Sequence, residues 1–173
     1  QRYWWFKTFC MAWYVNYICS WLYKIKTVFM IANKDNPLNI YSKDRQHVYF
    51  YFDELACRFT RAYEYSDLFV EKLIDLRSKM GQPMMITSGA RSYDHNKTIG
   101  GHPKSLHVYD KPFRSNQVGA LAIDVATRGS VFNYNLITLA LDLGWSVGVS
   151  KSFIHLDRRD FIGLKQGIFG YGT

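Results

Sequence analysis

Hydrophobic and polar residues alternate in distinct patterns along residues 47–159, and the patterns predict a mixture of helices and strands. Residues 66–81 carry apolar side chains at helical spacing, which predicts a helix whose buried stripe is Phe69, Leu73, Leu76 and Met80. Ser66 can cap the start of this helix, and Gly81 can end it. Residues 131–145 predict a second helix, with a buried stripe of Leu136, Leu139, Ala140 and Leu143.

Short apolar runs between and around these helices predict strands. They lie at residues 47–52, 82–89, 120–127, 145–149 and 152–159, the last two joined by a turn as the final strands. The stretch 86–110, "ITSGARSYDHNKTIGGHPKSLHVYD", is rich in glycine, histidine and polar residues, and we interpret it as non-helical. Short strands in mixed order with flanking helices predict an α+β fold with a small antiparallel or mixed sheet.

Residues 1–32 have a different composition, with four of the five tryptophans and no charged side chain between Thr8 and Tyr23. This uncharged run is shorter than the ~20 residues that span a bilayer. Its aromatic content and basic flanks predict an interfacial helix or short membrane anchor. The alternative is a helix that packs on the domain or within an oligomer. The polar residues 33–46 read as a linker or surface loop, so the domain is expected at 47–173.

The charge balance points to an anionic partner, because 22 Lys+Arg against 14 Asp+Glu give a formal net charge of +8. The basic residues are scattered and form no recognition helix or stripe, which argues against nucleic acid. Phospholipid or an anionic cell-wall polymer remains as the expected partner. The three cysteines form no CxxC pair and no disulfide framework.

Three residues carry the candidate chemistry. His107 lies near the end of the stretch 86–110, whereas Asp124 and His155 each interrupt an apolar predicted strand. A buried carboxylate is costly unless something compensates it. Two imidazoles and one carboxylate make a familiar catalytic zinc set with one position left for water. The alternative is an aspartate bonded to loop amides or an arginine, beside histidines that only serve packing.

Five motifs follow one another along residues 88–157. They are Ser88-Gly89-Ala90-Arg91, Asn96 with Gly100-Gly101, Ser105-Leu106-His107, "ALAID" at 120–124, and His155-Leu156-Asp157. In this order they resemble the zinc D-Ala-D-Ala carboxypeptidase family, which includes phage endolysin peptidases and shares its fold with the hedgehog signalling domain. The resemblance covers about residues 50–160.

This resemblance implies a ligand set and a substrate site. His107, Asp124 and His155 would bind zinc, and Arg91 would bind the substrate or the developing oxyanion. Ser105 would contact the substrate or support a ligand. His95 and His102 are interpreted as loop residues.

The chain departs from the family pattern at two places. Sixteen residues separate His107 from Asp124 where the family usually has six, which predicts a ten-residue surface insertion near 108–117 and makes Asp110 a rival ligand. The glutamate or histidine expected just before the last ligand is also missing. Asp157 would share a strand face with His155, either as the general base or as a carboxylate that orients the imidazole. A third possibility is a surface ion pair with one of the arginines that follow it.

The expected function is therefore a zinc metallopeptidase that cuts peptide bonds in peptidoglycan stem peptides. It would act as a carboxypeptidase or an endolysin-type endopeptidase at a cell envelope or membrane surface, or on a host cell wall if phage-encoded. Two alternatives are an inactive zinc-containing binding module of the same fold and a membrane-interaction protein without metal.

Overall fold

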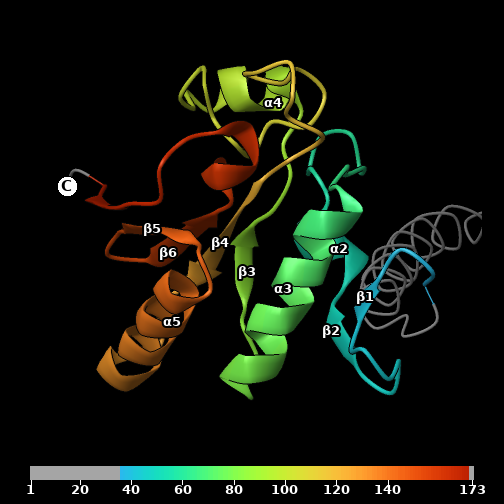
Figure 1. Cartoon of the computed structure of the whole chain (residues 1–173). Coiled ribbons are helices and arrows are strands. Elements are labelled where there is room, and N and C mark those ends of the chain that lie inside the picture. The colour runs from blue at the N-terminus through green and yellow to red at the C-terminus, as the bar shows by residue number, and fades with distance from the viewer. Residues whose placement is uncertain (1–35, 172–173) are drawn as a thin grey trace, which may run out of the picture. The chain divides into compact units, whose positions relative to one another are not determined.

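A five-stranded sheet organises residues 36–171, which are the residues that the computed structural model describes (Figure 1). Its order is β3–β4–β6–β5–β7, with bounds Ile86–Ser88, Ala122–Ala126, Phe153–Asp157, Ser146–Val149 and Ile168–Gly170. Strands β3 to β5 pair antiparallel, and β7 runs parallel to β5. The predicted α+β class with a small mixed sheet is confirmed. The final strand β7 was not predicted.

Four helices accompany the sheet in the described part of the chain, together with the 3-10 turn η1 (Arg159–Ile162). The helices are α2 (Phe52–Leu55), α3 (Asp67–Met80), α4 (Tyr93–Thr98) and α5 (Ser130–Asp142). The caps predicted for α3 are confirmed, because the Ser66 side chain accepts a hydrogen bond from the Phe69 amide and Gly81 has a φ of +68°. On α5, Phe132, Leu136 and Ala140 are buried, while Leu139 and Leu143 are only partly buried.

Helix α4 corrects the interpretation of residues 86–110 as non-helical. It begins because the Ser92 side chain accepts a hydrogen bond from the His95 amide, a normal N-cap arrangement. Its six residues are too few to show an apolar period, so no helical pattern is visible in the sequence.

A two-stranded ribbon precedes the helices, made of β1 (Ile40–Tyr41) and β2 (Val48–Phe50). Ile40 pairs with Phe50, and both are buried. The compact unit begins at Pro37, so part of the segment 33–46 interpreted as a linker belongs to the folded domain. A two-residue strand is too short to be recognised from alternation.

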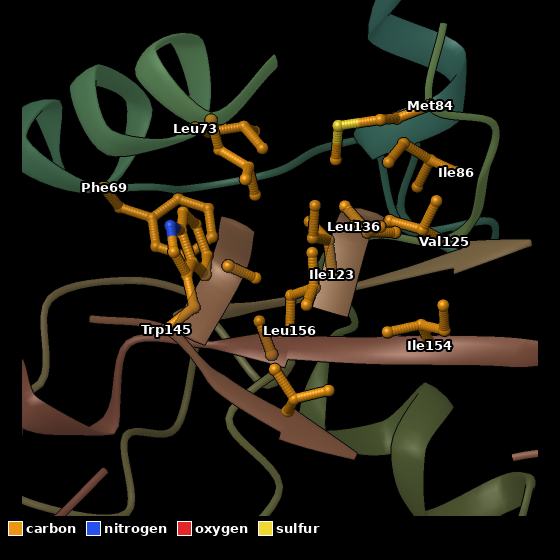
Figure 2. Close-up of a cluster of buried hydrophobic side chains, with 14 of the residues drawn as sticks. Phe69, Leu73, Met84, Ile86, Ile123, Val125, Leu136, Trp145, Ile154 and Leu156 are labelled. Atoms are coloured by element: carbon orange, nitrogen blue, oxygen red, sulfur yellow. The ribbon is translucent and has the colours of Figure 1, made fainter. Parts of the chain in front are cut away.

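The core lies between helices α3 and α5 and one face of the sheet. Figure 2 shows Phe69 and Leu73 of α3 in one cluster with Trp145 and with side chains of β4 and β6. Strands β4 and β6 contribute Ile123, Val125, Ile154 and Leu156, all fully buried. Because strand side chains alternate between faces, Asp124, His155 and Asp157 point to the opposite face of the same two strands. The sheet thus separates an apolar core from a polar site.

No helix within residues 36–171 is long and apolar enough to cross a membrane. The predicted anchor at residues 1–32 lies outside the described residues.

Candidate metal centre

The two strand-borne residues of the site face each other across a β-ladder. Asp124 of β4 pairs directly with His155 of β6, so the backbone register sets their separation. Asp124 Oδ1 lies 2.8 Å from Nδ1 of His155. Both side chains are buried.

His107 reaches the same point from a loop. Its Nε2 lies 3.2 Å from His155 Nδ1 and 3.3 Å from Asp124 Oδ1. The loop is held beside β4 because the Leu121 amide donates to the Leu106 carbonyl at 2.7 Å. His107, Asp124 and His155 therefore form a buried group that could hold a metal ion.

The partner of each imidazole decides which nitrogen faces the cluster. His107 Nδ1 lies 2.8 Å from the Gly89 carbonyl oxygen, which can only accept, so Nδ1 carries the proton and Nε2 offers its lone pair. Burial lowers the pKa of His107, although Asp124 opposes this effect. The neutral imidazole is the form that binds metal.

The outer ring nitrogen of His155 contacts a carboxylate, whereas that of His107 contacts a backbone carbonyl. Its Nε2 lies 3.1 Å from Asp157 Oδ2, which leaves Nδ1 toward the cluster. Burial alone would lower the pKa of His155, but the carboxylates of Asp124 and Asp157 raise it above its ordinary value. A metal at this site would therefore displace a proton from His155.

Asp157 is fully buried, and all its accepting positions are used. Besides His155, it accepts hydrogen bonds from the Arg159 amide at 3.0 Å and from Nε and Nη2 of Arg159 at 2.9 and 2.6 Å. Burial alone would raise its pKa, but Arg159 and His155 lower it below the ordinary value. Asp157 is thus an ionised carboxylate held between the Arg159 guanidinium and the His155 ring.

Arg91 stands beside the cluster with part of its guanidinium unused. Nη1 donates to Asn96 Oδ1 at 3.1 Å, and Nη2 lies 4.0 Å from Asp124 Oδ2. Its buried Nε has no hydrogen-bond partner among the described residues. Burial alone would raise the pKa of Asp124, but His107 and His155 lower it far below its ordinary range, so Arg91 faces an ionised carboxylate.

The cluster lies in a cleft of about 860 Å³. Arg91 and Ser105 line this cleft together with the three cluster residues, so all the residues predicted for the site come together. Ser105 Oγ also accepts a long hydrogen bond, 3.4 Å, from the His107 amide. The rest of the lining combines polar and basic side chains with an apolar part that includes Phe113, Phe153, Leu164, Phe169 and Tyr171.

Residues 108–117 bulge away from the ligands as a fixed loop. The Gln117 side-chain amide donates to the carbonyls of Val108 and Gly119, both at 3.0 Å. Asp110 is exposed and accepts from the Tyr93 amide at 2.7 Å, which removes it from the ligand set. Phe113 alone of this loop lines the cleft.

The remaining two histidines of residues 86–110 lie outside the cluster. His95 is buried on α4, where its Nδ1 lies 3.2 Å from Cys57 Sγ and its ring stacks on Phe59. His102 is exposed at the cleft, and its Nδ1 accepts from the Lys104 amide at 3.1 Å.

Sequence reasoning missed the carbonyl of Gly89 and the aromatic side of the cleft. The pattern could have suggested Gly89 only as a glycine that follows a strand. Phe169 and Tyr171 lie beyond the last recognised motif, in a segment with no apolar alternation.

Two histidines and an aspartate at the floor of a cleft, on the polar face of an α+β sheet, could hold a metal ion with the donor set that metal-dependent hydrolases use. The family model of Peptidase M15 matches residues 48–157, well over half of the chain. The chain belongs to this family, which confirms the resemblance to the zinc D-Ala-D-Ala carboxypeptidases. Its members are metal-dependent peptidases. No curated protein matches the sequence.

Proposed function

We propose that this domain is a zinc-dependent peptidase that hydrolyses peptide bonds in peptidoglycan stem peptides, as a D-Ala-D-Ala carboxypeptidase or an endolysin-type endopeptidase. The observation that carries the proposal is the buried triangle of ligand atoms on His107, Asp124 and His155 at the floor of an open cleft.

The size of this triangle fits zinc. Ligand atoms about 2.0–2.1 Å from one tetrahedral ion lie about 3.3 Å apart. Two of the three separations, 3.2 and 3.3 Å, match this value, and the third, between Asp124 Oδ1 and His155 Nδ1, is shorter at 2.8 Å. Two imidazole nitrogens and one carboxylate oxygen also match the donor set of catalytic zinc sites, which leave a fourth position open.

A zinc ion in this set would lower the pKa of a water molecule toward neutrality and polarise the scissile carbonyl. The chain's own residues supply the positioning. The Gly89 carbonyl and Asp157 fix the rings of His107 and His155, so both present a lone pair to the same point. Arg91 lines the cleft, and its two Nη groups have N–H donors left to bind a carbonyl or carboxylate oxygen of the peptide.

For Asp157, the contacts support the orienting role over the role of general base. A base must take a proton from water at the cleft, whereas Asp157 is 0% exposed and bonded through both oxygens. This is the arrangement of a carboxylate behind a metal-binding histidine.

The burial and full hydrogen bonding of Asp157 favour a second candidate function, an inactive binding module that keeps the metal. Only two carboxylates from the described residues line the cleft; Asp124 belongs to the ligand set and Asp157 is saturated. On this alternative, zinc binds and a stem peptide is held, but no bond is cut.

We also propose that the protein acts at a cell envelope, membrane surface or host cell wall. The formal net charge of +8 supports this, because it attracts the chain to anionic polymers and lipids.

Metal content per chain tests the proposal first. Elemental analysis is expected to find about one zinc in the wild type and little in His107→Ala, Asp124→Ala and His155→Ala. Asp110→Ala is the matched control and should retain zinc, because its carboxylate contacts the Tyr93 amide and not the cluster. A wild type without zinc, or zinc retained in all three variants, contradicts the site.

Activity then separates the two candidate functions. The zinc-loaded wild type is incubated with purified stem peptides, and the products are identified by mass. Loss of the terminal residue indicates a carboxypeptidase, and an internal cut indicates an endopeptidase. A zinc-loaded protein that binds the peptides but leaves them intact supports the binding module.

A further inference from the structure

Tyr171 lies against the metal centre from the far edge of the sheet. It follows β7, and its amide donates to the Val149 carbonyl at 2.9 Å, which fixes its backbone to β5. Its ring centroid lies 5.8 Å from that of His155, in an edge arrangement with an interplanar angle of 66°. It lines the same cleft as the three cluster residues.

The neighbouring strand leaves room for this ring. Gly148 of β5 pairs with His155 on one side and with Phe169 of β7 on the other. A Cβ on Gly148 would lie 2.6 Å from Cε2 of Tyr171 and 2.7 Å from Cε2 of Phe169. The absence of a side chain at residue 148 therefore lets both rings lie over the sheet beside His155. Phe153 adds a contact at 5.1 Å between ring centroids, so Tyr171 is held by aromatic neighbours.

The hydroxyl of Tyr171 has no hydrogen-bond partner within residues 36–171. Because 42% of the residue is exposed, the hydroxyl is accessible to a ligand. A phenol with a packed ring and an unused hydroxyl at a cleft wall is suited to donate to a ligand.

Arg91 and Tyr171 come from opposite edges of the five-stranded sheet. Arg91 follows β3 and Tyr171 follows β7, whereas the cluster belongs largely to the central strands β4 and β6. A substrate carbonyl placed over the cluster would thus have a cationic donor on one side and a neutral donor on the other. Preorganised donors on both sides are the arrangement that stabilises charge developing on a carbonyl oxygen.

We propose that Tyr171 is a further catalytic residue, whose hydroxyl donates a hydrogen bond to the substrate oxygen that becomes negative as the peptide bond is attacked. This rests on the proposed peptidase function. Tyr171 lies outside the residues matched by the family model, which end at 157. The role therefore rests on a residue that follows the matched segment and not on the matched motifs.

The test is Tyr171→Phe in the zinc-loaded full chain, which removes the hydroxyl and keeps the packed ring. We expect kcat on stem peptide to fall about 100-fold, the usual cost of one oxyanion donor, with KM and zinc content unchanged. Affinity for a phosphinate analogue of the tetrahedral intermediate should fall by a similar factor, because the interaction forms only with the charged oxygen. Tyr134→Phe, an exposed tyrosine on α5, is the matched control and should have no effect.

The outcomes separate this inference from the function on which it rests. An active wild type with an equally active Tyr171→Phe variant overturns the role of Tyr171 and leaves the peptidase intact. A variant that changes only KM, with phosphinate affinity unaltered, also overturns it. A zinc-loaded wild type that cuts no peptide overturns the peptidase proposal itself, and the inference falls with it.

Discussion

The metal centre has two halves that are built in different ways. Asp124 and His155 are opposite residues of one antiparallel ladder, and their neighbours in sequence, Ile123 and Leu156, are fully buried in the core. His107 belongs to a loop, and a single carbonyl oxygen orients its ring. The strand-borne half is therefore fixed by the register that folds the domain, whereas the loop-borne half depends on a few close contacts.

The two halves therefore differ in which structural change would disturb their ligands. Slipping a strand to disturb Asp124 or His155 would also expose the core residues beside them, so the register is strongly specified. On the loop side, Gly89 packs so tightly that a Cβ would lie 2.3 Å from the Leu55 carbonyl oxygen. The Ala90 amide donates to that same oxygen at 2.8 Å. A small change in this backbone would move the carbonyl that holds His107.

The largest effect short of removing a ligand is expected for Asp157→Asn, in the strand-borne half. An amide nitrogen would meet the N–H groups of His155 or Arg159, and the negative charge between them would be lost. We expect zinc affinity to fall about 10- to 100-fold, measured by competition with a chelating dye. Asp160→Asn is the control, because that carboxylate pairs with Arg158 and should leave affinity unchanged. Unaltered affinity in Asp157→Asn would mean that the strands alone orient His155.

A smaller effect on the metal is expected for Gly89→Ala, in the loop-borne half. The added methyl group must displace backbone, so the protein should lose ~1–3 kcal/mol of unfolding free energy. Zinc affinity should fall about tenfold as the carbonyl moves away from His107. Thermal unfolding and the same competition titration measure both quantities.

The control for this change is Gly167→Ala, whose Cβ would meet nothing within 4 Å. It should leave zinc affinity unchanged. If Gly89→Ala weakens folding but not zinc binding, the carbonyl does not orient His107, and the two halves are less different than the contacts suggest.

The smallest effect is expected for Ser105→Ala. Its hydrogen bond from the His107 amide is long, at 3.4 Å, so zinc affinity should stay within about twofold. If the hydroxyl binds substrate, KM should rise by roughly 2- to 10-fold, the equivalent of ~0.5–1.5 kcal/mol. Ser115→Ala, an exposed position in the insertion, is the control for steady-state kinetics. An unchanged KM would remove Ser105 from the substrate site.

The strand-borne half is also the half that could be predicted best from the sequence. A carboxylate and an imidazole that each interrupt an apolar strand are visible as local exceptions, and the helix 66–81 was predicted with both of its caps. His107 was a candidate from its place near the end of residues 86–110, and the family motifs added Arg91 and Ser105. The pattern could not reveal α4 or β1, because elements of six and two residues show no period.

The burial of single residues and the pairing of distant strands could not be predicted from the sequence either. The role of Asp157, as a base or as the group that orients His155, depends on its burial and on the two hydrogen bonds that the Arg159 guanidinium donates to it. Both features are visible only in the folded chain. Tyr171 reaches the centre because β7 returns parallel to β5, and no local signal in that segment predicts the pairing.

The insertion between His107 and Asp124 allows the wall of the cleft to vary in sequence without disturbing the metal ligands. The hydrogen bond from the Leu121 amide to the Leu106 carbonyl ties the base of the loop, and Gln117 ties its interior. The entropy of closing a loop grows only with the logarithm of its length, so doubling the length costs only about 0.6 kcal/mol more. Residues 111–116, between these fixed ends, can therefore be lengthened, shortened or exchanged at little thermodynamic cost while the ligands stay in place. Since Phe113 from this loop forms part of the cleft wall, variation there would alter what the cleft accepts independently of its chemistry.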